Sequence, residues 1–165
     1  MAKGHFVSKP GKDFDWKAFQ KHVGYTDAEM KALMNDPKKK EHIQKISSPE
    51  VQDKYLIAEI VESRGCIGGM QVGDRIYFKG MSLLDGEISD PWCPLIVNTY
   101  WFTSGMRNMV KFGLDPNSMY VNYSGCMDVG PEHGLGRVVY KIYAVDAKDV
   151  EKERAARKKK LAAKK

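Results

Sequence analysis

The sequence has few cysteines and no long hydrophobic run, and each shortage excludes a class of protein. Three cysteines, an odd number with no C-x-x-C pair, argue against a disulfide framework and against common zinc-finger spacings. No stretch approaches the roughly 18 apolar residues of a transmembrane helix, and the polar opening MAKGHFVSKPGKDFDW is unlike a secretory signal. We therefore expect a cytoplasmic protein with reduced thiols and no membrane association.

Nucleotide-binding fingerprints are also missing. The glycine-rich stretch 64–78, RGCIGGMQVGDRIYF, lacks the P-loop spacing and its Lys-Ser/Thr pair. No helix is predicted directly after it, so its backbone amides have no helix dipole behind them to bind a pyrophosphate. The glycines suit a tight turn between two strands, with Asp74 accepting a hydrogen bond from a backbone N–H. This interpretation leaves Cys66 unexplained.

Most of the chain has no net charge. The formal charge is +6, but residues 151–165 hold eight Lys or Arg and two Glu, while the other 150 residues hold 19 basic and 19 acidic side chains. A folded nucleic-acid reader usually carries its basic face on the domain itself, so we do not expect the body to bind nucleic acid. The basic tail is either a solvated helix end or a contact for an acidic partner, RNA or an anionic surface.

The hydrophobic periodicity predicts an α+β fold. Helical spacing marks the first third of the chain, with a helix stop at Gly24 and a capping box formed by Thr26 and Glu29. Strand patterns at 55–63, 74–80, 118–126 and 137–145 surround a helix predicted over 92–112. Since short loops favour antiparallel pairing, we expect a small antiparallel sheet, in the order strand–strand–helix–strand–strand, with that helix packed on one face.

Three segments follow from these patterns. They are a helical N-terminal extension (1–54), an α+β core domain (55–145) and a basic helical tail (146–165). In the last strand, alternation predicts two faces, with Val138, Tyr140, Ile142 and Ala144 on one and Val139, Lys141, Tyr143 and Val145 on the other.

The cysteines are the candidate functional residues. Cys66, Cys93 and Cys126 lie 27 and 33 residues apart, each at the boundary of a predicted element, and boundaries of neighbouring elements can converge in space. Thiolates bind zinc and iron, and a thiol at a helix N-terminus, as predicted for Cys93, is favoured as the thiolate. The alternative is that all three are small buried hydrophobic side chains. His133, beside Glu132, is either a ligand or proton shuttle or an ordinary loop histidine.

The cysteine motifs resemble a family of small uncharacterised bacterial and archaeal proteins that are common in anaerobes. The family pattern is Cys-x-x-Gly-His-x-Val-Gly-Asp between two strands, a Cys-Pro that opens a helix, and a late Cys-x-Asp. The matching residues here are Cys66, Gly69, Val72, Gly73 and Asp74, then Cys93 and Pro94, then Cys126 and Asp128. The resemblance covers about residues 55–145 and implies that the three cysteines belong to one site. This chain departs from the pattern at Met70, where the family often carries His.

Two functions remain open on the sequence. The first is a small accessory subunit that binds a larger enzyme subunit by protein–protein interaction, and the resemblance places it in anaerobic metabolism. The absence of a catalytic dyad and of a cofactor fingerprint favours a non-catalytic subunit over an enzyme. The second is a metal- or cluster-binding protein that holds zinc or iron through Cys66, Cys93 and Cys126, with a minor enzymatic role. Met70 weighs against zinc, because zinc binds a thioether poorly whereas soft metals accept it.

Overall fold

The computed structural model describes residues 5–93 and 99–163. The chain divides into two compact units, and the boundary falls between Gln52 and Asp53. Among the described helices, none is both long enough and apolar enough to cross a membrane.

The N-terminal unit consists of short helices around an aromatic cluster. Its elements are η1 (Gly11–Asp13), α1 (Trp16–Val23), α2 (Asp27–Met34), α3 (Pro37–Ile46) and α4 (Pro49–Gln52). The cluster contains the buried Phe14, Phe19, Met30 and Leu33, with Phe6, Trp16 and Ile43 packed against it. The predicted helix signals are confirmed, because Gly24 ends α1 in the left-handed conformation at φ 78° and Thr26 forms the capping box of α2 with Glu29.

Loss of this capping box is expected to destabilise the N-terminal unit. The Thr26 hydroxyl accepts a hydrogen bond from the Glu29 N–H at 3.3 Å, and the Glu29 carboxylate accepts one from the Thr26 N–H at 2.8 Å. The Thr26→Ala variant should lose about 1 kcal/mol of unfolding free energy, measured by urea denaturation with far-UV circular dichroism. Thr26→Ser keeps the hydroxyl and is the matched control. Equal midpoints for the two variants would argue against a contribution from the cap.

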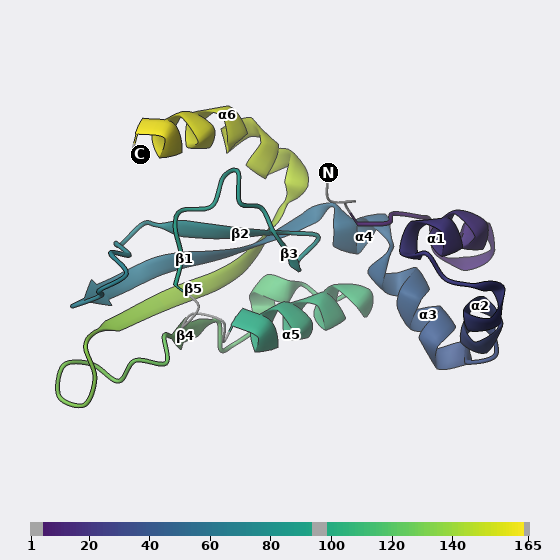
Figure 1. Cartoon of the computed structure of the whole chain (residues 1–165), viewed down its shortest axis with the longest axis horizontal. Helices are drawn as coiled ribbons and strands as arrows, with labels where there is room; N and C mark the ends of the chain where they lie inside the picture. Colours follow the sequence, from purple (N-terminus) through teal and green to yellow (C-terminus); the bar gives the residue numbers. More distant parts are fainter. Residues whose placement is uncertain (1–4, 94–98, 164–165) are drawn as a thin grey trace. The chain divides into compact units, whose positions relative to one another are not determined.

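The second unit is built on an antiparallel sheet with strand order β3-β2-β1-β5-β4, which confirms the predicted α+β class (Figure 1). The strands are β1 (Lys54–Arg64), β2 (Arg75–Lys79), β3 (Leu83–Leu84), β4 (Tyr123–Gly125) and β5 (Arg137–Asp146). The helices are α5 (Thr99–Lys111), η3 (Pro116–Ser118) and α6 (Ala147–Ala163). Of the helix predicted over 92–112, residues 94–98 lie outside the described residues, and Trp92 and Cys93 are not helical.

The strand predicted over 118–126 is much shorter, and Asn117 supplies the reason. Its side-chain oxygen accepts the Ala144 N–H at 2.8 Å, and its amide donates to the Ala144 carbonyl at 2.9 Å. This side chain therefore satisfies the edge of β5 at a point where β4 would otherwise have to continue. Only Tyr123–Gly125 remain as strand, opposite Val139–Lys141.

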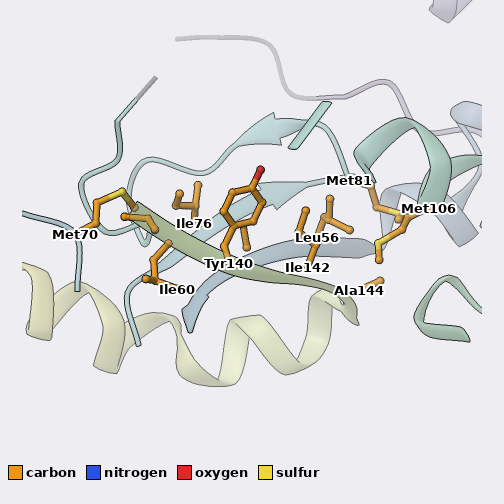
Figure 2. Packing of buried hydrophobic residues seen from close by; sticks show 11 residues of the cluster. Leu56, Ile60, Met70, Ile76, Met81, Met106, Tyr140, Ile142 and Ala144 are labelled. Carbon is orange, nitrogen blue, oxygen red and sulfur yellow. The ribbon is translucent and has the colours of Figure 1, made fainter. Parts of the chain in front are cut away.

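Alternate side chains of the central strands form two cores on opposite faces of the sheet. On one face Leu56, Ala58 and Ile60 of β1 pack with Val138, Tyr140, Ile142 and Ala144 of β5 and with Met106 of α5. On the other face Tyr55, Ile57 and Tyr77 pack with Val150 of α6, with Tyr143 and Val145 at the edge. The predicted alternation of the last strand is thus confirmed. Figure 2 shows the first core, with Met70 at one end and Met81 and Met106 at the other.

The basic C-terminal helix α6 is an integral part of the second unit. Arg157 is buried and donates to Asp90 at 2.6 Å, Arg154 pairs with Asp85, and Lys158 pairs with Glu87. The acidic partners all lie in residues 85–90, the segment that follows β3. Much of the positive charge of α6 is therefore matched by carboxylates of the sheet domain, whereas the sequence predicted either a solvated helix end or a contact for an external partner.

Candidate thiol site

The structure brings the three cysteines together around one cavity of about 340 Å³. Cys66 follows β1, Cys93 follows the segment after β3, and Cys126 follows β4. All three are free thiols with intermediate exposure. The described walls of the cavity are Cys66, Ile67, Gly68, Met70, Cys93, Cys126, Asp128, Leu135, Gly136, Arg137 and Val138. We call this the thiol cavity. The three cysteines therefore converge on one space; Cys66 and Cys126 follow strands as predicted, whereas Cys93 does not lie in a helix.

A glycine turn positions Cys66 and keeps the space beside it open. Gly65 and Gly69 have φ values of 64° and 70°, and the Gly69 N–H donates to the Cys66 carbonyl at 3.0 Å. A Cβ atom on Gly68 would lie 3.7 Å from the Cys66 sulfur and 3.6 Å from the Cys93 Cβ. The absence of a side chain at Gly68 thus leaves room between the two thiols.

The same turn continues into β2 as predicted. The Asp74 carboxylate accepts the Gln71 N–H at 2.8 Å, and Gly73 has φ 86°. These contacts confirm the turn chemistry assigned to Asp74. Met70, which lies between this turn and Cys66 in the sequence, is in the cavity wall. Met70 is 4% exposed and lines the cavity together with the three cysteines.

The Cys126 sulfur makes two contacts with its surroundings. It accepts the Val138 N–H at 3.3 Å and lies 3.7 Å from the Asp128 carbonyl oxygen. Backbone N–H bonds to cysteine sulfur are one of the means by which proteins tune metal-bound thiolates. This arrangement follows from the pairing of β4 with β5, in which Gly125 lies opposite Val139.

Asp128 closes the loop that follows Cys126. Its carboxylate accepts backbone N–H bonds from Gly130 at 3.3 Å, Leu135 at 3.0 Å and Gly136 at 3.0 Å. These bonds, the one from Gly136 first, lower the pKa of Asp128. The carboxylate is therefore committed to the loop 128–136, and it shapes the thiol cavity by holding that loop closed.

Removal of this carboxylate should alter how the protein responds to acid. The pKa of Asp128 is lower in the folded chain than in the unfolded chain, where it is about 3.9. Its contribution to stability is thus complete above that value and is lost as the pH falls through the folded pKa. The Asp128→Asn variant should show a smaller fall of the melting temperature between neutral pH and about pH 3 than the unmodified protein.

The control for this experiment is Glu132→Gln in the same loop. Glu132 is exposed, and its substitution should leave the acid dependence of the melting temperature unchanged. The assignment of Asp128 fails if the melting temperature of the Asp128→Asn variant depends on pH as steeply as that of the unmodified protein.

Three other charged or titratable residues lie in or next to the loop that follows Cys126. His133 and Glu132 are exposed in the loop 128–136 and are not among the described residues that line the thiol cavity. Arg137, which the sequence did not single out, lines the cavity as its one basic residue among those described. Its only sequence signal is its position at the start of the last strand, close to the element that follows Cys126.

The arrangement does not match a mononuclear metal site. Within residues 5–93 and 99–163, no three Cys, His, Asp or Glu side chains are grouped so that they could hold a single metal ion. The cavity is nevertheless large, and Ile67, Leu135 and Val138 give it an apolar wall. Three soft sulfur donors around an apolar cavity favour a soft metal or a group that contains several metal atoms.

Comparisons with known proteins give no further assignment. No family model matches the chain, and neither curated proteins nor solved structures include a significant match. The resemblance to the family of small bacterial and archaeal proteins therefore stays a prediction, and the site rests on its own geometry.

Proposed function

We propose that this protein binds a metal centre through Cys66, Cys93 and Cys126. The observation that supports the proposal is that three cysteines from three separate segments border one cavity. A purely structural role as small hydrophobic side chains does not require the thiols to meet at a common space. The hydrogen bonds that Asp128 accepts from backbone N–H groups hold the loop beside that space, and the lack of a side chain at Gly68 leaves the space free.

Metal analysis of protein purified without oxygen tests this proposal. We expect stoichiometric bound metal by mass spectrometry and thiols that react only after the metal is removed. Each of the variants Cys66→Ser, Cys93→Ser and Cys126→Ser should lose most of the metal while keeping its far-UV circular dichroism. Val72→Ser is the matched control, because Val72 is exposed in the same turn and is not among the described cavity residues. Metal-free protein with three freely reacting thiols would refute the proposal.

A second candidate function is that of an accessory subunit, and an exposed apolar patch favours it. The patch consists of Trp101 and Phe102 of α5 with Met119, Tyr120 and Val121, which border a shallow pocket. Trp101 is 74% exposed and Tyr120 is 99% exposed. Exposed aromatic side chains that lie together are characteristic of protein–protein interfaces. We propose that a larger protein subunit covers this patch in the cell.

Native purification from the source cells tests the accessory role. We expect one enzyme subunit to co-purify with the unmodified protein and to be lost from the double variant Trp101→Ser/Tyr120→Ser. The control Val7→Ser changes an exposed apolar residue of the N-terminal unit. Light scattering of the isolated chain shows whether a second copy of the chain covers the patch instead. A concentration-dependent dimer that the double variant abolishes would assign the patch to a second copy and refute the accessory role.

A further inference from the structure

The geometry of the thiol cavity points to an iron–sulfur cluster in which one iron has no protein thiolate. This inference rests on the proposed metal-binding function and names the class of metal centre. It follows from the placement of three cysteines around one cavity, the nature of the cavity walls and the number of ligands that the chain can supply.

A single metal ion is not the occupant that best fits the thiol cavity. A single tetrahedral ion draws its thiolates to about 2.3 Å from one point, and the described residues contain no such group. A cluster binds each thiolate to a different iron and so accepts sulfurs that are farther apart. The volume agrees, because 340 Å³ is far more than the roughly 30 Å³ occupied by one water molecule.

The walls of the cavity suit an iron–sulfur cluster. Ile67, Met70 and Leu135 supply apolar surface, and the open position at Gly68 lets a bulky group approach Cys66 and Cys93. The Val138 N–H already donates to the Cys126 sulfur at 3.3 Å. N–H bonds of this kind are one of the factors that set the reduction potentials of clusters.

The ligand count leaves one iron open. The chain has only three cysteines, and the residues outside the described ranges, 1–4, 94–98 and 164–165, include no Cys, His, Asp or Glu. Among the described residues, His133 does not line the cavity and the Asp128 carboxylate is occupied by backbone N–H groups. A cluster with four irons would therefore keep one iron for an external ligand, and Arg137 in the cavity wall favours a small anion.

Anaerobic reconstitution of the full chain with ferrous iron and sulfide tests the class of centre. We expect about four irons and about four sulfides per chain, with a broad visible absorption band. Incorporation should fall at least tenfold in each Cys→Ser variant and remain unchanged in Val72→Ser. Stoichiometric binding of zinc alone, with no uptake of iron and sulfide, would overturn the cluster and leave the proposed metal-binding function standing. Failure to bind either metal would overturn both.

Whether one iron lacks a protein ligand is tested on the reconstituted protein after reduction with dithionite. Addition of cyanide, a small anion, should shift the electron paramagnetic resonance signal of the cluster. The Arg137→Gln variant should require a several-fold higher cyanide concentration, while Arg64→Gln should behave as the unmodified protein. Arg64 of β1 lies opposite Arg137 of β5 in the register of the two strands, but it is not among the described cavity residues. A signal that does not respond to cyanide would overturn the open iron.

Discussion

Replacing Arg157 with alanine is expected to lower the free energy of unfolding of the second unit by about 3–5 kcal/mol, because it leaves a buried carboxylate without its counter-charge. The side chains of Arg157 and Asp90 are 9% and 0% exposed and meet at 2.6 Å. Arg157 also donates to the Ile88 carbonyl at 3.0 Å and lies over the Tyr77 ring, with 5.2 Å from its guanidinium carbon to the ring centroid. Urea denaturation of the full chain, followed by near-UV circular dichroism, measures the loss.

The control lies two residues farther along the same helix. Lys159 is an exposed cation of α6, and Lys159→Ala should change the unfolding free energy by less than about 0.5 kcal/mol. The double variant Asp90→Asn/Arg157→Met should be more stable than Arg157→Ala, because asparagine keeps an acceptor for the Arg75 N–H and removes the unpaired charge. Similar midpoints for Arg157→Ala and Lys159→Ala would contradict a stabilising role of the ion pair.

This ion pair also connects α6 to the thiol cavity. Asp90 accepts bonds from both Arg157 and the backbone N–H of Arg75, so it fixes the segment after β3 against β2 and α6. Cys93 follows Asp90 by three residues. Detachment of α6 should therefore displace one of the three proposed ligands, and metal content should fall in Arg157→Ala but not in Lys159→Ala.

The sequence predicted those parts of the fold that depend on local patterns. The alternation of β5, the capping box at Thr26 and the turn at Asp74 each arise from a few adjacent residues, and each was confirmed. The docking of α6 has no such local pattern, because only Val150 and Arg157 of this helix are buried. Its attachment depends on ion pairs with carboxylates 67 to 71 positions away, and charge composition alone does not indicate which carboxylates those are.

The candidate site, too, could be predicted from the sequence only where it depends on local patterns. The positions of Cys66 and Cys126 after strands were visible in the sequence, whereas the helix start predicted at Cys93 is not seen there. The meeting of the three thiols depends on strand order and register. β1 lies between β2 and β5, and β5 carries β4 on its outer side, so the segments after β1 and β4 reach the same end of the sheet. The roles of Gly68 and Arg137 depend on that register, and neither residue type carries a signal of its own.

The Gly136→Ala variant tests whether close packing of two loops maintains the thiol cavity. A Cβ atom on Gly136 would run into the backbone carbonyl of Gly65 and approach the Arg64 carbonyl oxygen at 2.8 Å. These obstacles are backbone atoms and cannot rotate away as a flexible side chain can. We expect a loss of about 1–3 kcal/mol of unfolding free energy, typical of overpacking, in urea denaturation.

The Gly136→Ala variant should also bind less metal, and this loss should exceed what its lower stability alone would cause. Gly65 precedes Cys66, and Gly136 is held by the Asp128 carboxylate in the loop that follows Cys126. Forcing these loops apart should separate the two thiols and lower metal content even where the protein remains folded. Gly86→Ala is the matched control, because no described atom lies within 4 Å of its added Cβ. A Gly136→Ala protein with full metal content and unchanged stability would show that the contact between Gly65 and Gly136 does not shape the cavity.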